Sequence, residues 1–130
     1  MSDYAQVITP EGLALEATQI FGISTTPVLY MAIGKGTTKP TKSDGRKVME
    51  SEVYRGLATI THDGKGNISA SLSVPAGTVT EETAITEYAL FTAASGGVMY
   101  ARATRAPVTI SSTVGGTMTF PVNRSGGSSE

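Results

Sequence analysis

The stretch Ile68-Ser69-Ala70-Ser71-Leu72-Ser73-Val74 decides the fold class of this chain. Apolar and serine side chains alternate along it, and successive side chains of a β-strand point to opposite faces. The pattern therefore predicts a strand with one face buried in a core and the other face formed by a row of serines.

Turn residues flank this strand on both sides. Before it, His62-Asp63-Gly64-Lys65-Gly66-Asn67 has the glycines and the asparagine of a hairpin turn, and after it Pro75-Ala76-Gly77 ends the strand. Further strands are predicted over residues 28–33, 52–61, 84–91, 98–104, 107–110 and 117–122. Short strands spaced about ten residues apart are typical of an all-β fold, here an antiparallel β-sandwich or a jelly-roll-like barrel. Pro121 in the last strand indicates an edge position.

One short N-terminal helix is predicted over residues 10–21. Thr9 is a good N-cap, Pro10 suits the first helical position, and Gly22 suits the C-terminal cap. Between them lies an apolar stripe of helical period, formed by Leu13, Ala17, Ile20 and Phe21.

The length of 130 residues fits one domain. We expect a single β-sandwich domain over residues 1–122, with an N-terminal arm at 1–8, and a Gly/Ser-rich tail at 123–130. Both termini are expected to contact neighbouring subunits. Residues 34–47 form a long loop rich in Gly, Lys, Thr and Pro.

The charge balance argues against nucleic acid as a partner, because the net charge is -1. The one basic stretch is interpreted as a solvated, mobile loop; it contains Lys35, Lys39, Lys42, Arg46 and Lys47. The sequence has no apolar run of membrane-spanning length, and the N-terminus does not resemble a signal peptide. With charged residues at only 16%, the surface is suited to packing against other subunits.

No catalytic or metal site is expected. The single histidine, His62, stands beside Asp63 in a predicted turn, and no cysteine is present. Gly34-Lys35-Gly36-Thr37 lacks the first glycine of a phosphate-binding loop, since Leu29 occupies that position. We expect no enzymatic activity and no cofactor.

Three segments together resemble a family of small tailed-phage virion proteins that includes tail-fibre and collar-like modules. They are Thr9 to Leu15, then Met31 to Pro40 followed by Glu52-Val53-Tyr54-Arg55, and finally Ile85 to Gly97 running into Tyr100-Ala101-Arg102-Ala103. The resemblance covers most of residues 9–122 and implies a particle component without catalytic residues.

Two sets of residues are candidates for subunit or strand contacts. Glu52 with Arg55 and Glu87 with Arg102 are expected to form ion pairs that fix strand register or join subunits. The uncharged candidates for subunit contact are Ser69, Ser71, Ser73, Thr117 and Thr119, and Arg124 is a further candidate in the tail. We expect a homotrimer built mainly from residues 68–122, with the loop at 35–47 facing away from its axis.

The leading functional hypothesis is a capsid decoration (cement) protein that stabilises a phage head by subunit contacts. Its partners would be further copies of itself and a major capsid protein or a tail protein, with no nucleic acid and no membrane. It would be made in the host cytoplasm and located in the virion. The first alternative is a tail-fibre or collar attachment module. The second is a carbohydrate-binding β-sandwich, which the absence of Trp disfavours.

Overall fold

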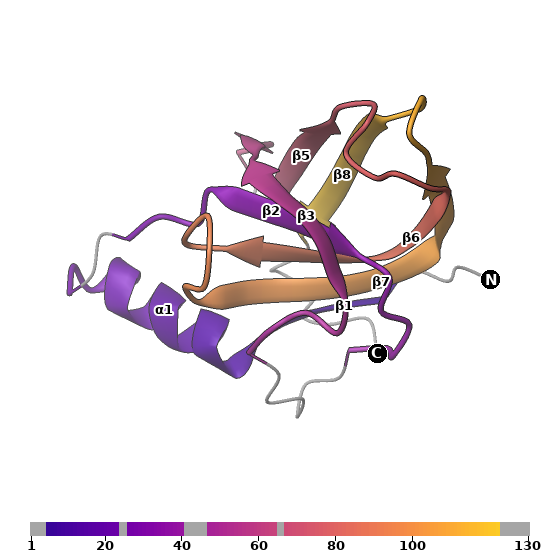
Figure 1. Ribbon diagram of the computed structural model, residues 1–130. Coiled ribbons are helices and arrows are strands. Elements are labelled where there is room, and N and C mark those ends of the chain that lie inside the picture. Colours follow the sequence, from indigo (N-terminus) through magenta and orange to yellow (C-terminus); the bar gives the residue numbers. More distant parts are fainter. Residues whose placement is uncertain (1–4, 24–25, 41–46, 65–66, 123–130) are drawn as a thin grey trace.

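Two antiparallel sheets face each other, and one helix lies beside them (Figure 1). The computed structural model describes residues 5–23, 26–40, 47–64 and 67–122. The larger sheet has the order β1 (Ala5–Ile8), β7 (Met99–Ile110), β6 (Thr83–Phe91), β2 (Tyr30–Gly34) and β3 (Glu52–Leu57). The smaller sheet has the order β4 (Thr59–His62), β5 (Ile68–Val74) and β8 (Gly116–Val122). The predicted fold class, an all-β sandwich with one short helix, is confirmed.

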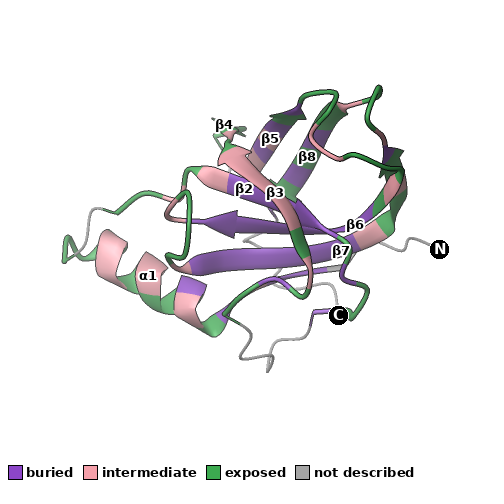
Figure 2. Cartoon of the chain, in the orientation of Figure 1, coloured by how far each residue is buried: buried purple, intermediate pink, exposed green. Residues whose placement is uncertain are grey.

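The core lies between the inner faces of the two sheets. The smaller sheet contributes Ala70, Leu72, Val74, Met118, Phe120 and Val122, and the larger sheet contributes Met31, Ile33, Tyr88, Leu90, Ala101 and Ala103. All of these side chains are buried, as the purple strands of Figure 2 show. The strand β5 that the alternation predicts is confirmed: its apolar side chains face this core, and its serines face outward. Burial of each large apolar side chain contributes about 1.5–3 kcal/mol.

The larger sheet is covered on its outer face as well. A second cluster of buried apolar side chains lies there, formed by Ala32, Met49, Ala89, Phe91 and Met99. Met49 belongs to the loop between β2 and β3, so this loop packs onto the sheet. As a result, β6 is buried on both faces from Ile85 to Phe91 instead of alternating.

The helix α1 (Pro10–Ile20) begins and ends at the predicted capping residues. Gly12 N–H donates to the side chain of Thr9 at 2.9 Å, and Pro10 occupies the first turn. Gly22 has a φ of 75°, and the N–H of Ile23 donates to Thr18 O, which completes a Schellman motif. Among the described residues, no helix is long and apolar enough to cross a membrane.

Gly12 is the point at which α1 approaches the sheet. A Cβ added there would lie 2.1 Å from the carbonyl oxygen of Tyr100 on β7. The missing side chain therefore lets the first turn of the helix rest on β7.

Three predicted boundaries are wrong. The two strands expected at 98–104 and 107–110 are one strand, β7. Pro107 is tolerated within it because it lies in a bulge, opposite the register shift between Ile85 and Glu87 of β6, where the strand needs no backbone N–H for pairing. The strand expected at 52–61 divides into β3 and β4, which belong to different sheets. The arm expected at 1–8 is a strand, β1, for residues 5–8, which pair with Ala101 to Thr104.

Candidate contact surfaces and the buried ion pair

Glu87 on β6 and Arg102 on β7 form an ion pair on the outer face of the larger sheet. Arg102 Nε lies 2.7 Å from Glu87 Oε2, and the two side chains are 1% and 0% exposed. The pair was predicted from the sequence, and it joins two neighbouring strands within one chain. Removing one member of such a buried pair costs about 3–5 kcal/mol, because the other charge is left uncompensated.

The carboxylate of Glu87 also holds the loop between β2 and β3. Oε1 accepts hydrogen bonds from the backbone N–H groups of Gly36 at 3.0 Å and Ser51 at 3.1 Å, and Oε2 accepts one from Glu50 N–H at 2.7 Å. Arg102 Nη1 donates to Thr38 O at 2.7 Å. One buried ion pair therefore fixes both described ends of the loop on the sheet.

The sequence interpretation of this loop is only partly right. Lys35, Lys39 and Lys47 are exposed, as expected of a solvated basic stretch. The backbone around them is held by Glu87 and Arg102, so residues 35–40 and 47–51 do not behave as the expected mobile loop. Lys42 and Arg46 lie outside the described residues.

Gly34 and Gly36 are required by the close approach of Glu87. A Cβ at Gly36 would lie 2.5 Å from Glu87 Oε1, and a Cβ at Gly34 would lie 2.8 Å from the same atom and 2.3 Å from Ser51 O. The Gly-Lys-Gly motif thus leaves room for the buried carboxylate of Glu87. This close approach, and not a phosphate-binding loop, accounts for the two glycines.

Glu50 extends the network toward solvent. Its Oε1 accepts from Thr37 N–H and Thr38 N–H, each at 3.0 Å, and its Oε2 accepts from the Thr38 hydroxyl at 2.9 Å. The backbone hydrogen bond from Thr38 is the main cause that holds the pKa of Glu50 below its ordinary value, and Arg102 at 3.4 Å adds a smaller effect.

The second predicted pair, Glu52 with Arg55, lies within a single strand. A register shift opposite Ile33 and Gly34 brings both side chains to the outer face of β3, where Arg55 Nη2 lies 2.8 Å from Glu52 Oε1. The guanidinium also stacks 3.5 Å from the ring centroid of Phe91. Arg55 Nη1 donates to the carbonyl groups of Ala93 and Gly96, so this arginine ties β3 to the β6–β7 turn.

These charged groups are already engaged with the protein itself. The carboxylate of Glu87 accepts four N–H donors and is fully buried, so none of its oxygens faces a space that a substrate could enter. Within the described ranges, no group of three or more His, Cys, Asp or Glu side chains is placed to hold a metal ion. The geometry of the network is that of a structural clamp.

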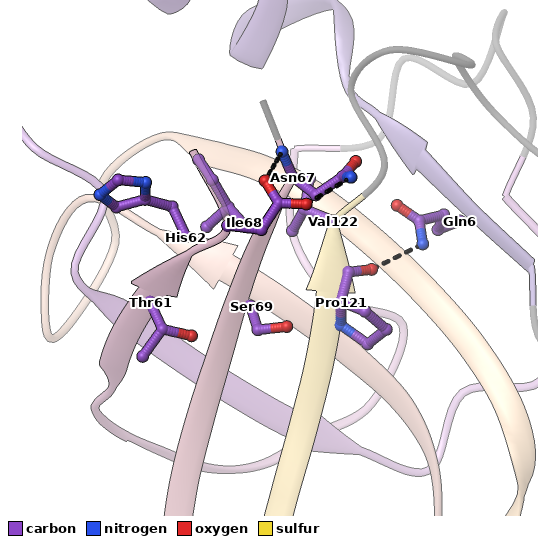
Figure 3. Close-up of a pocket in the computed structure, with 9 residues that line it drawn as sticks. Gln6, Thr61, His62, Asn67, Ile68, Ser69, Pro121 and Val122 are labelled. Atoms are coloured by element: carbon purple, nitrogen blue, oxygen red, sulfur yellow. Dashed lines mark hydrogen bonds between the residues drawn. The ribbon is translucent and has the colours of Figure 1, made fainter. Parts of the chain in front are cut away.

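His62 lies at the rim of an open hollow of about 510 Å³ at the β4–β5 turn (Figure 3). Its Nδ1 accepts a hydrogen bond from Gly64 N–H at 3.2 Å. The Asp63 carboxylate accepts hydrogen bonds from the backbone N–H and from the side-chain amide of Asn67. In Figure 3 the imidazole lies on the far side of the hollow from Gln6 and Pro121. Asp63 therefore closes the hairpin turn instead of orienting the histidine, as the turn interpretation predicted.

The predicted hydroxyl residues gather on the outer face of the smaller sheet. Cross-strand pairing places Ser71 opposite Thr119 and Ser73 opposite Thr117, with the two hydroxyl oxygens of the first pair 3.3 Å apart. The sequence analysis missed Thr59 and Thr61 on β4, which pair with Ser71 and Ser69 and so share this face. The resulting hydroxyl face comprises Thr59, Thr61, Ser69, Ser71, Ser73, Thr117 and Thr119, and none of these described side chains is charged. Arg124 lies outside the described residues.

A group of exposed apolar side chains lies where α1 ends and β2 begins, and we name it the apolar end. It comprises six exposed large apolar side chains: Ile20, Phe21, Ile23, Leu29, Leu57 and Ile60. Ile20 and Ile60 line one hollow of about 340 Å³, and Ala58 N–H donates to Leu29 O, which brings the β3–β4 junction beside the start of β2. Phe21 is 78% exposed.

The apolar stripe that predicted α1 thus faces mainly outward. Leu13, Ala17, Ile20 and Phe21 are all exposed. The helix rests on the sheet through Gly12 instead, and Tyr100 donates a hydrogen bond from its hydroxyl to Glu16. Contiguous exposed apolar side chains commonly mark sites of protein–protein contact.

Comparisons with models of known families, with curated proteins and with solved structures found no match to this chain.

Proposed function

We propose that this chain is a non-enzymatic structural subunit of a tailed-phage particle that acts through its contacts with other subunits. The observation that carries the proposal is the pair of surfaces that expose mainly hydroxyl or apolar side chains, the hydroxyl face and the apolar end, on a domain whose buried charges pair with each other. Neutral surfaces with apolar side chains are cheap to desolvate, and depletion of charge is typical of interface cores. The resemblance to small virion proteins supports the phage context.

Self-association through the hydroxyl face into a homotrimer is part of this proposal. The clamped loop lies on the outer face of the larger sheet, whereas the hydroxyl face is the outer face of the smaller sheet. A contact through the hydroxyl face would therefore leave Lys35, Lys39 and Lys47 facing away from it. Identical copies that associate usually form closed symmetric assemblies, and a phage head offers threefold positions.

Capsid decoration is the first place that we propose for such a subunit. Copies that meet through the hydroxyl face would turn the apolar end toward a major capsid protein. An attachment module in a tail fibre or collar is the second candidate. The specific observation in its favour is that the two surfaces differ in chemistry, since a module that joins two different proteins needs one surface for each.

Particles assembled without this chain distinguish the two candidates. Loss of a decoration protein leaves heads that are complete but break more readily on heating, with tails and fibres in place. Loss of an attachment module leaves heads of normal stability and removes fibres or collars. Particles that keep their appendages, heat stability and infectivity without the chain would contradict both.

The apolar end has its own test. Exchange of both Ile20 and Phe21 for serine is expected to leave the folded domain intact, because both side chains are exposed, and to reduce incorporation into particles. Val114→Ser is the matched control, since Val114 is exposed in the β7–β8 turn, outside the apolar end. Equal incorporation of the double variant and the control would show that this surface makes no contact.

A carbohydrate-binding role receives less support from the geometry. The hollow beside His62 has polar groups from Gln6, Thr61, Asp63 and Asn67, but among the described residues no Tyr, Phe or Trp lines it. Sugar rings are commonly held against the face of an aromatic side chain.

A further inference from the structure

One buried hydroxyl lacks the partner that buried polar groups normally have. Among the described residues, Thr104 Oγ1 on β7 is the only buried side-chain nitrogen or oxygen without a hydrogen bond, and Thr104 is 5% exposed. Since the great majority of buried polar atoms are paired, an orphaned hydroxyl has hydrogen-bonding capacity that a bound water or ligand can use.

Thr104 lines a hollow of about 240 Å³ at the bulge in β7. The shift of register opposite Thr86 leaves Arg105, Ala106 and Pro107 without regular partners, and this opens the strand. Bulges are common beside functional sites because they redirect side chains and end strand pairing. The clamped loop forms the other wall through Thr37 and Lys39.

The charges around this hollow are positive. Lys39 and Arg105 line it, and no carboxylate of the described residues does. Arg105 donates from Nε to Ala106 O and from Nη1 to Tyr88 Oη, which holds its guanidinium in place while Nη2 makes no hydrogen bond to a described residue. Lys39 is exposed and forms no ion pair with any described residue.

We infer that this hollow binds an oxyanion, either a phosphate group or a carboxylate. Two cationic side chains attract the anion, and the hydroxyl of Thr104 donates the hydrogen bond that it otherwise lacks. Hydrogen bonds to a charged acceptor are shorter and stronger than those between neutral groups. The site is separate from both contact surfaces and does not depend on the function proposed above.

Titration of the isolated full-length chain with inorganic phosphate, and separately with sodium acetate, tests the inference at constant ionic strength. We expect saturable changes in amide NMR shifts at Thr104 and Ala106. Stronger binding of phosphate would identify a free or covalently attached phosphate as the ligand. Stronger binding of acetate would identify an acidic side chain.

Thr104→Val keeps the shape of the side chain and removes its hydroxyl, so it should weaken binding about tenfold while leaving the rest of the spectrum unchanged. Lys39→Gln should weaken binding to a similar extent. Lys47→Gln, an exposed lysine outside the hollow, is the matched control and should leave affinity unchanged. Shifts that do not saturate, or equal affinity in wild type and Thr104→Val, would overturn the inference.

Discussion

The carboxylate of Glu87 and the guanidinium of Arg102, 2.7 Å apart, join two neighbouring strands and at the same time hold a loop that is remote from both in sequence. Four hydrogen bonds from the loop end on these two side chains: Gly36, Glu50 and Ser51 donate to Glu87, and Thr38 O accepts from Arg102. The pair therefore links the stability of the sheet to the position of the loop, and the first two predictions follow from this arrangement.

Glu87→Gln is expected to lower the free energy of unfolding by about 3–5 kcal/mol, because Arg102 stays buried and loses its nearer and fully buried counter-charge, keeping only the half-exposed Glu50 at 3.4 Å. Chemical denaturation measures the change. Glu11→Gln is the matched control, since Glu11 makes only an exposed contact of 3.7 Å with Lys47, and its effect should stay within about 0.5 kcal/mol. Equal stability of the two variants would mean that the buried pair does not hold the fold together.

Gly36→Ala is expected to cost about 1–3 kcal/mol, because the new methyl group would overlap Glu87 Oε1 at 2.5 Å and Glu50 Cβ at 2.6 Å. The loop should also become easier for trypsin to cleave after Lys35. Gly116→Ala is the control, since a Cβ there meets nothing within 4 Å and the residue is not at positive φ. A neutral Gly36→Ala would show that the loop is not held against Glu87.

Glu50 should titrate below its ordinary pKa of 4.5. The folded protein favours the ionised carboxyl, chiefly through the Thr38 backbone N–H, so its stabilising contribution is present above the unfolded-state pKa and is lost as the pH falls through the folded-state pKa. NMR titration of the side-chain carboxyl carbon measures this pKa. Thr38→Val removes the hydroxyl donor and should raise it toward the ordinary value. A wild-type pKa at or above 4.5 would contradict the geometry.

Thr119→Lys is expected to break the proposed trimer without unfolding the domain. Thr119 is exposed on the hydroxyl face, opposite Ser71 of the central strand β5, and a buried unpaired ammonium would oppose association. Light scattering should give a trimer for the wild type and a smaller species for the variant. Ser112→Lys, exposed in the β7–β8 turn, should remain trimeric. A wild-type monomer at high concentration would rule out the trimer.

Local signals in the sequence predicted the parts of the fold that depend on local chemistry. The alternation at β5, the Thr9 and Gly22 caps of α1 and the Asp63–Asn67 turn each rest on residues a few positions apart. The edge position of β8, read from Pro121, is also correct.

The errors arose where the outcome depended on partners far along the chain. The strand β1 has only four residues, and only its pairing with β7 defines it as part of the sheet. The strand β7 was predicted as two strands because the bulge at residues 105–107 can be recognised only from its pairing with β6, where Ile85 is opposite Val108 and Glu87 opposite Thr104. The apolar stripe on α1 has the period of a buried helix face. The helix nevertheless packs on Tyr100 through the side that carries Gly12, and this leaves the stripe exposed.

The sequence predicted the ion pairs of the candidate site but not the way in which they hold the loop. Both ion pairs were recognised from residue types, whereas the role of Glu87 in holding the loop depends on Gly36, Glu50 and Ser51, which lie 36–51 positions away in the sequence. Gly34 and Gly36 were the signal that could have revealed this role, since two glycines on either side of a lysine allow another side chain to approach the backbone closely.

If this chain is a structural subunit of a phage particle, as we propose, purified particles must contain it at a defined copy number. Quantitative mass spectrometry of purified particles from a phage that encodes the chain gives its copy number relative to the major capsid protein. The account predicts a fixed stoichiometric ratio, with hundreds of copies for a decoration protein or a small multiple of three for an attachment module. Absence of the chain from purified particles would contradict the account.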